Sequence, residues 1–220
     1  MKDPVSRIQD SGAAPIPASL PAFSPQPSAL DPTSILIVGV GGQGTILAAR
    51  ILSRVALLAG KDVKFSETHG MAQRGGAVVT QVRIGDRIFA PTIDPGTADF
   101  ILAFEQLEAL RWSHMLKPDA AVIMSTQIIS PMPVILGTAK YPQGVEKSVS
   151  RRGKVFAMDA DRLACEAGNA RAANVVLLGR LGRELGLPRE IWEQALADTV
   201  KPKFLESNRR ALAAGWEHQI

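Results

Sequence analysis

Apolar residues of this chain form short continuous runs separated by stretches with helical spacing. Residues 35–38 are an uninterrupted run of Ile, Leu, Ile and Val, which is typical of a strand buried on both faces of a parallel sheet. A glycine-rich turn follows, and from 45 to 59 apolar residues recur every three or four positions, which predicts a helix that ends at Gly60. Residues 63–66 predict a second strand. The order strand, glycine turn, helix, strand indicates an α/β protein.

Two β-rich runs, 77–84 and 87–90, are separated by Gly85 and Asp86, and this pattern predicts a hairpin. A helix is expected over 105–116, closed by Lys117 and Pro118, and a Pro- and Gly-rich excursion spans 130–153. Three further buried strands are expected at 100–104, 121–125 and 155–158.

From Asp161 onward the pattern is helical, with helices expected at 162–167, 172–185, 189–200 and 204–215. We therefore expect an α/β fold: a Rossmann-like, open, mostly parallel but mixed sheet with flanking helices and a helical C-terminal region. Residues 34–220 form this domain. Residues 1–33 contain seven of the fifteen prolines and predict a disordered or extended N-terminal arm, or alternatively a strap on a partner subunit.

Composition restricts the chemistry that the chain performs by itself. The single Cys165 excludes a disulfide framework and the usual ligand set of an iron–sulfur cluster. The three histidines, His69, His114 and His218, are too far apart to form a local zinc motif. If the protein takes part in redox or metal chemistry, we expect the metal on another protein and none on this one.

Charge and hydropathy exclude further classes. The 25 Lys and Arg residues against 21 Asp and Glu are dispersed, and aromatic residues are 5%, so we expect no nucleic-acid partner. Apolar runs are far shorter than the roughly 18 residues of a membrane span. No apolar block follows the N-terminal Lys as in a signal peptide, so we expect a cytoplasmic location.

The glycine turn fits the pattern G-x-G-x-x-G through Gly39, Gly41 and Gly44, with Gly42 and Gln43 between them. Such a turn lets an anion approach backbone amides at a helix N-terminus. A dinucleotide site usually has an acidic residue at the end of the second strand, where Ser66 stands with Glu67 one position later. Phosphate binding and a packing or subunit-contact role both remain open.

A second segment, 66–76, is dense in chemically active side chains. It contains a carboxylate, an imidazole, an amide and a guanidinium, and its candidates are Glu67, His69, Gln73, Arg74, Gly75 and Gly76. Arg74 is suited to a carboxylate or phosphate, and His69 to proton transfer. If the first two strands are adjacent, the segment leaves the sheet at the same edge as the glycine turn. The alternative is a polar loop with turn glycines.

Several segments resemble the γ-type domain of the 2-oxoacid:ferredoxin oxidoreductase family, most of all its indolepyruvate-type β subunits. The similar segments are 35–44 (ILIVGVGGQG), 66–76 (SETHGMAQRGG), 102–105, 174–179, 201–203 and Asn208. The similarity extends from about residue 34 to 215. The proline-rich arm departs from the family pattern.

This resemblance implies a non-autonomous subunit. In the family a larger α subunit carries thiamine diphosphate, Mg and [4Fe-4S] clusters. The complex converts an aryl 2-oxoacid and coenzyme A (CoA) to acyl-CoA and CO2 while it reduces ferredoxin. We expect the loops Gly39–Gly44 and 69–76 to face the partner's active site, with His69 and Arg74 as candidate catalytic residues. The alternative is a stand-alone nucleotide-binding or regulatory module that uses the Gly39–Gly44 loop.

Six other positions have structural interpretations. We expect Asp159 and Asp161 to cap a helix, and Cys165 to be a small core residue. His114 is expected to be structural or exposed. Trp192 and Leu196, spaced i and i+4, are expected on a helix face in the core or an interface.

Overall fold

A six-stranded sheet in the order β2-β3-β1-β4-β5-β6 forms the centre of the computed structural model, which describes residues 32–69 and 75–219. The strands are β1 (Thr33–Val40), β2 (Asp62–His69), β3 (Ala77–Gly85), β4 (Ala98–Ala103), β5 (Leu116–Ser125) and β6 (Lys154–Met158). The helices are α1 (Thr45–Leu58), α2 (Gln106–Trp112), α3 (Met132–Ile135), α4 (Val145–Val149), α5 (Ala160–Glu166), α6 (Ala173–Leu185), α7 (Arg189–Thr199) and α8 (Pro202–Glu217). The predicted N-terminal arm lies outside the described residues up to residue 31.

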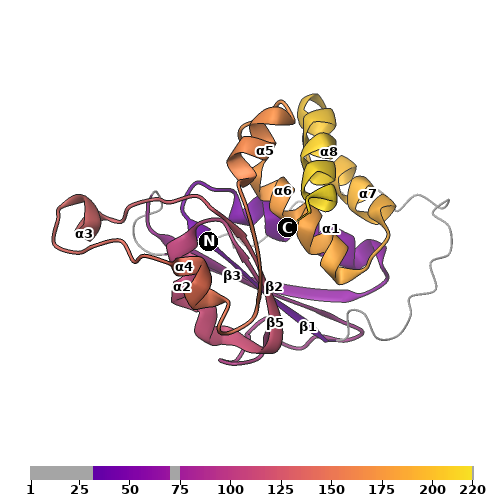
Figure 1. The fold of residues 1–220 in the computed structure, drawn as a ribbon. Coiled ribbons are helices and arrows are strands. Elements are labelled where there is room, and N and C mark those ends of the chain that lie inside the picture. Colours follow the sequence, from indigo (N-terminus) through magenta and orange to yellow (C-terminus); the bar gives the residue numbers. More distant parts are fainter. Residues whose placement is uncertain (1–31, 70–74, 220) are drawn as a thin grey trace, which may run out of the picture.

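Helices cover both faces of the sheet, as expected for a strand run that is apolar without interruption (Figure 1). On β1, Ile35 and Ile37 pack into the core beneath α1 and the C-terminal helices. Leu36 and Val38 point to the opposite face and pack into the core with residues of α2 and α4. The α/β class and the mixed sheet with flanking helices are therefore confirmed.

The expected hairpin over 77–90 is wrong. Residues 87–90 form no strand, and β3 pairs antiparallel with β1 on one side and with β2 on the other. Within the expected second strand, the amide of Ile88 donates to the side chain of Asp62 (Oδ2) at 2.9 Å and not to a backbone carbonyl. Just beyond it, the amide of Ile93 donates to Gln81 Oε1 at 2.7 Å. The segment after β3 is thereby held as a loop.

The first two predicted strands are parallel but not adjacent, because β3 is inserted between them. Their carboxyl ends still lie at one edge of the sheet, since Gly39 and His69 are both paired with Val78 of β3. β2 is also longer than expected and includes Glu67 and His69, which were assigned to a loop.

The helix expected over 105–116 is shorter. It ends at Trp112, a 3-10 turn covers Ser113–Met115, and Lys117 and Pro118 belong to β5. A register shift between β4 and β5 separates the pair Ala98–Leu116 from the pair Phe100–Ala121, and such an irregularity accommodates a proline. Lys117 is held there by an ion pair with Asp99 of β4.

The four C-terminal helices match their expected ranges to within a few residues as α5, α6, α7 and α8. Trp192 and Leu196 are fully buried on α7, which confirms the core assignment. Asp159 caps α5 by accepting a hydrogen bond from the amide of Arg162 at 3.0 Å. His114 is exposed and stacks on Trp112. Cys165 is exposed on α5, so its assignment to the core is wrong.

Candidate functional site

The glycine turn after β1 is organised by the side chain of Gln43. Its Oε1 accepts a hydrogen bond from the amide of Val40 at 2.7 Å, and its Nε2 donates to the carbonyl of Phe104 at 2.9 Å and to Gln127 Oε1 at 2.5 Å. A Cβ on Gly39 would lie 2.8 Å from Gln43 Oε1, so only glycine leaves room for this side chain. Gln43 thus ties the turn to the ends of β4 and β5.

Gly44 begins α1 in the left-handed conformation, with φ of 85°. Its carbonyl accepts a hydrogen bond from Asn174 Nδ2 at 3.2 Å, and a Cβ at Gly44 would lie 2.6 Å from the same nitrogen. Asn174 is buried in the first turn of α6. The close approach therefore holds the N-termini of α1 and α6 together.

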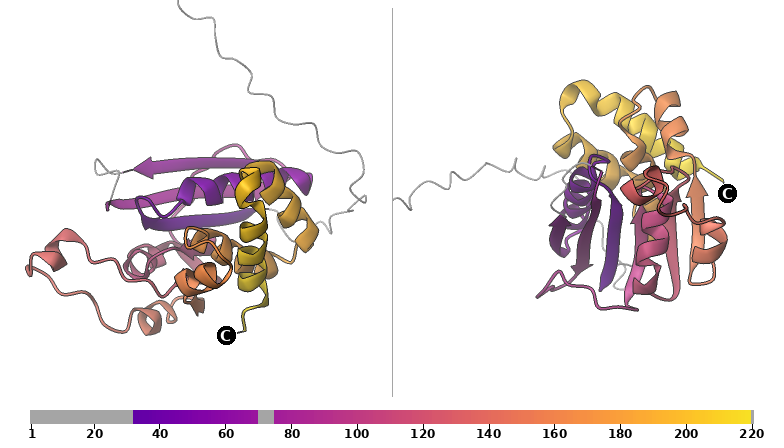
Figure 2. Two further views of the ribbon diagram at one scale, coloured as in Figure 1. Left: turned by 90° about the horizontal axis from the view of Figure 1, so that it is seen from above. Right: turned by 90° about the vertical axis from the view of Figure 1, so that its left-hand side faces the viewer.

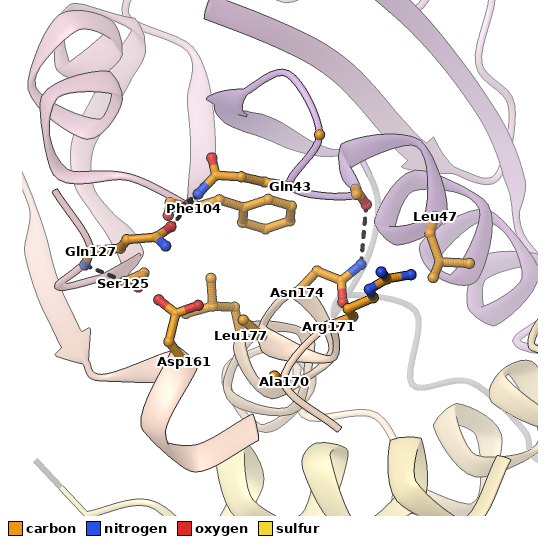
Figure 3. A pocket seen from close by; sticks show the side chains of 13 residues that line it. Gln43, Leu47, Phe104, Ser125, Gln127, Asp161, Ala170, Arg171, Asn174 and Leu177 are labelled. Carbon is orange, nitrogen blue, oxygen red and sulfur yellow. Dashed lines mark hydrogen bonds between the residues drawn. The ribbon is translucent and has the colours of Figure 1, made fainter. Parts of the chain in front are cut away.

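A pocket of about 540 Å³ opens beside this turn (Figure 3). Six polar side chains line it: Gln43, Ser125, Gln127, Asp161, Arg171 and Asn174. Phe104, Leu47 and Leu177 supply apolar walls. A second cavity of about 490 Å³ adjoins it, sharing Leu47 and Arg171, and it continues along Val200, Phe204 and Asn208. Together they form one site with a polar half and a more apolar half.

The electrostatics of the polar half favour an anion. The N-cap residues of α1 and α6, Gly44 and Ala172, make no side-chain cap, and both helix ends lie at the pocket, where the helix dipoles add partial positive charge. In α6 one first-turn donor is already satisfied, because the amide of Val175 donates to Asn174 Oδ1 at 2.9 Å. Arg171 adds a full charge on the lining. Asp161 opposes them, and its pKa is raised, first by burial and then by the charge of Asp159.

The second predicted segment occupies a different place. The amide of Gly41 donates to the carbonyl of Gly76 at 2.9 Å, so the two loops do meet at one edge. The pocket, however, draws on Gly42, Gln43 and Gly44 and on none of the described residues between 66 and 76, because it lies toward β4 and β5 while β2 lies on the far side of β3. Gln73 and Arg74 are outside the described residues, as is the side chain of His69.

Sequence reasoning missed most of the polar lining. No motif marks Gln127, Arg171 or Asn174 as a site residue, and the position of Asp161 after a strand indicates only a helix cap. These residues lie 84 to 130 positions from the glycine turn to which Gln127 and Asn174 are bonded. The one available signal was the position of Asn174 within a family-like segment.

The structure disfavours the dinucleotide interpretation of the turn. In that fingerprint the glycines leave backbone open to a pyrophosphate. Here the side chain of Gln43 lies against Gly39, and that of Asn174 lies against Gly44.

Within residues 32–69 and 75–219, no group of three or more His, Cys, Asp or Glu is placed to hold a metal ion. None of the described helices combines the length and apolar character that crossing a membrane requires.

Comparison with known proteins gives consistent matches. Residues 34–218 match the family model "Pyruvate ferredoxin/flavodoxin oxidoreductase". Indolepyruvate oxidoreductase subunit IorB of Archaeoglobus fulgidus is 42% identical over 194 residues, which are 85% of this chain and 95% of that protein. The γ subunit of keto/oxoacid ferredoxin oxidoreductase from Geobacter sulfurreducens PCA superposes with a TM-score of 0.64 at 28% identity, covering 84% of this chain and 96% of that one.

A longer relative contains the same domain within a larger chain. Ketoisovalerate oxidoreductase subunit VorA of Methanothermobacter thermautotrophicus is 28% identical over 189 residues. These residues are 83% of this chain but only 35% of that protein.

Proposed function

The chain belongs to the pyruvate ferredoxin/flavodoxin oxidoreductase family, and we propose that it is the small subunit of an indolepyruvate:ferredoxin oxidoreductase. It is a non-autonomous subunit of an oxidoreductase complex. The observation that supports the indolepyruvate substrate is the 42% identity to IorB, which extends over 95% of that protein. The complete reaction is the oxidative decarboxylation of an aryl 2-oxoacid with CoA, giving acyl-CoA, CO2 and reduced ferredoxin, in the cytoplasm.

The proposal divides the chemistry between two chains. The large α subunit carries thiamine diphosphate with Mg and the [4Fe-4S] clusters, and thiamine supplies the carbanion chemistry. The small subunit contributes binding, orientation and electrostatics. Its pocket offers Arg171 and the N-termini of α1 and α6, a combination suited to an anionic group such as a CoA phosphate or the oxoacid carboxylate.

The adjoining cavity fits the same substrate class. CoA combines phosphates with a long, mostly uncharged arm, and the two cavities present an anion-binding half beside a half lined by Val200 and Phe204. In this proposal the Gly39–Gly44 turn orients the bound group. The segment with Glu67, His69, Gln73, Arg74, Gly75 and Gly76 faces the partner at the same edge of the sheet.

Reconstitution tests the proposed function. The purified chain alone should not reduce ferredoxin with indolepyruvate and CoA, and activity should appear when a cluster-bearing α subunit is added. We expect indolepyruvate to give a higher kcat/KM than pyruvate or 2-ketoisovalerate. Activity of the isolated chain, or an active complex with no preference for aryl substrates, would contradict the proposal.

Arg171→Gln tests the anion site within the active complex. Loss of one charge-assisted contact should raise the KM for CoA by about tenfold with a smaller change in kcat. Arg151→Gln is the matched control, because Arg151 is exposed just before β6 at the opposite edge of the sheet. Equal KM values for CoA in both variants would show that Arg171 does not bind CoA.

A further inference from the structure

The segment between β5 and β6 leaves the body of the protein. Residues 126–144, here called the projecting loop, start at the carboxyl end of β5 and carry α3 at their outer end, away from the helices on both faces of the sheet (Figures 1 and 2). The loop contains no Asp or Glu and a single charged residue, Lys140. The loop therefore lacks the charged side chains that usually keep an exposed loop soluble.

Exposed apolar side chains gather on this loop. Ile128, Met132, Ile135 and Leu136 are 57%, 60%, 64% and 69% exposed, and α3 has no buried residue. They are four of the nine large apolar side chains that the described residues expose. Apolar groups collected on a protrusion mark a surface that another protein covers.

The base of the projecting loop is held by a buried carboxylate. Glu105, 1% exposed at the N-cap of α2, accepts hydrogen bonds through Oε1 from the amide of Ile129 at 3.1 Å and the hydroxyl of Tyr141 at 2.5 Å. Ile129 lies on the outgoing limb and Tyr141 on the returning limb, so one side chain fixes both. The Gln106 side chain adds a bond to the carbonyl of Thr126 at 2.7 Å.

The loop is thus positioned before any partner binds. Positioning in advance lowers the ordering cost that binding would otherwise incur. Within the loop, the carbonyl of Pro133 accepts hydrogen bonds from the amides of Thr138 and Ala139, so the turn after α3 is also held by its own backbone.

Two observations identify the partner. Gln127, in the first residues of the loop, lines the pocket and bonds to Gln43, so a protein that delivers its chemistry to the pocket must approach the loop as well. In the longer relative VorA, the equivalent domain is joined to further sequence that makes up most of the chain. A separate large subunit is the corresponding partner under the function proposed above.

We propose that the projecting loop docks into an apolar groove of the large, cofactor-bearing subunit, with Ile135 and Leu136 as its anchors. The inference rests on the proposed function, because that function supplies the large subunit. The pocket binds substrate beside the base of the loop, and the tip of the loop holds the partner over it.

The test compares full-length variants in complex formation with the α subunit, measured by titration calorimetry. The double variant Ile135→Ser, Leu136→Ser should weaken the complex at least about tenfold, as expected for two central anchors. Phe89→Ser is the matched control, since Phe89 is 82% exposed but lies beyond β3 at the opposite edge, and it should leave the affinity unchanged. Circular dichroism melting curves of the chains alone should coincide, because the altered side chains are exposed.

A second variant tests the base. Tyr141→Phe removes the hydroxyl that donates to Glu105 but leaves all four exposed apolar side chains in place. We expect it to weaken binding to the α subunit, with an effect on affinity several-fold smaller than that of the double variant. Unchanged affinity of the double variant would overturn the docking proposal, while failure of the wild-type chain to bind any α subunit would instead overturn the proposed function. A wild-type dimer that the double variant converts to a monomer, with α-subunit binding intact, would assign the loop to a second copy of this chain and also overturn the proposal.

Discussion

Gln43 shows how one side chain determines the use of a glycine turn. The residue does not belong to the dinucleotide fingerprint, and its bonds to Val40, Phe104 and Gln127 explain its presence. It joins a turn to the ends of two strands that follow far along the chain. The same bonds require glycine at position 39.

Gln43→Ala should lower the free energy of unfolding by about 1–3 kcal/mol, because it removes three hydrogen bonds and leaves buried backbone groups without their partner. Denaturant titration measures this change. Gln194→Ala on α7 is the control, since its amide bonds an exposed carboxylate, Asp198, and we expect a change below about 0.5 kcal/mol. Equal effects of the two variants would contradict the structural role of Gln43.

Asp161 gives a pH-dependent contribution to stability. Its folded-state pKa is raised above the ordinary value of 3.8, so the folded protein holds this proton more tightly than the unfolded chain. The contribution is fully present below that value and is lost as the pH rises through the raised pKa.

Asp161→Asn should therefore become progressively more favourable relative to the wild type as the pH rises from about 4 through the raised pKa of Asp161, and the difference should then level off. Unfolding titrations at a series of pH values measure the difference. Asp119→Asn, at an exposed carboxylate on β5, is the control. A difference between variant and wild type that does not change with pH would refute the assignment. Asp161→Asn should also bind an anion in the pocket more tightly, because it removes a negative charge from the lining.

At the scale of elements, α6 and α8 cross at glycine residues. A Cβ on Gly215 would lie 1.8 Å from the carbonyl oxygen of Val176, and a Cβ on Gly179 would lie 2.2 Å from that of Leu212. Neither obstacle is a flexible side chain, so the helix backbones themselves would have to separate. This crossing also sets the position of Asn174, which contacts Gly44 from the first turn of α6.

Gly215→Ala should destabilise the protein by about 1–3 kcal/mol, although alanine is the better helix former by about 1 kcal/mol. It should also weaken anion binding, since movement of α6 displaces Asn174 from the turn. Thermal unfolding and ligand titration are the measurements. Ala213→Ser adds one atom to α8 at a half-buried position and should be nearly neutral in both. A stabilised Gly215→Ala variant would show that the helices tolerate separation.

Strand order illustrates what element patterns leave open. The runs that became β1, β2 and β3 are all apolar enough to predict strands, and the turn residues Gly85 and Asp86 favour a hairpin with the run that follows. The alternative pairing of β3 between β1 and β2 satisfies both edges of β3 along its whole length. Local turn chemistry could not reveal this gain, because the partners are distant in sequence.

At the scale of the whole molecule, the protein is a binding platform for chemistry that another chain performs. The pocket, the carboxyl end of β2 with Glu67 and the base of the projecting loop all lie at the carboxyl edge of the sheet, which the ends of β1, β2 and β5 share. The family membership, the pocket and the exposed loop lead to one expectation. We expect the large subunit to cover the carboxyl edge of the sheet. The reconstitution, Arg171 and loop experiments test this expectation separately.

Local pattern alone determined the approximate positions of the six strands, the longer helices, the glycine turn and the family, but not the short helices α3 and α4. These features depend on the spacing of neighbouring residues: period two or a continuous run for strands, three to four for helices. The tertiary structure alone decided the strand order, the inclusion of Lys117 and Pro118 in β5, the exposure of Cys165 and the lining of the pocket. Each of these depends on which distant residue lies opposite, as Asn174 lies opposite Gly44 across 130 positions, and a linear pattern carries no information about that choice.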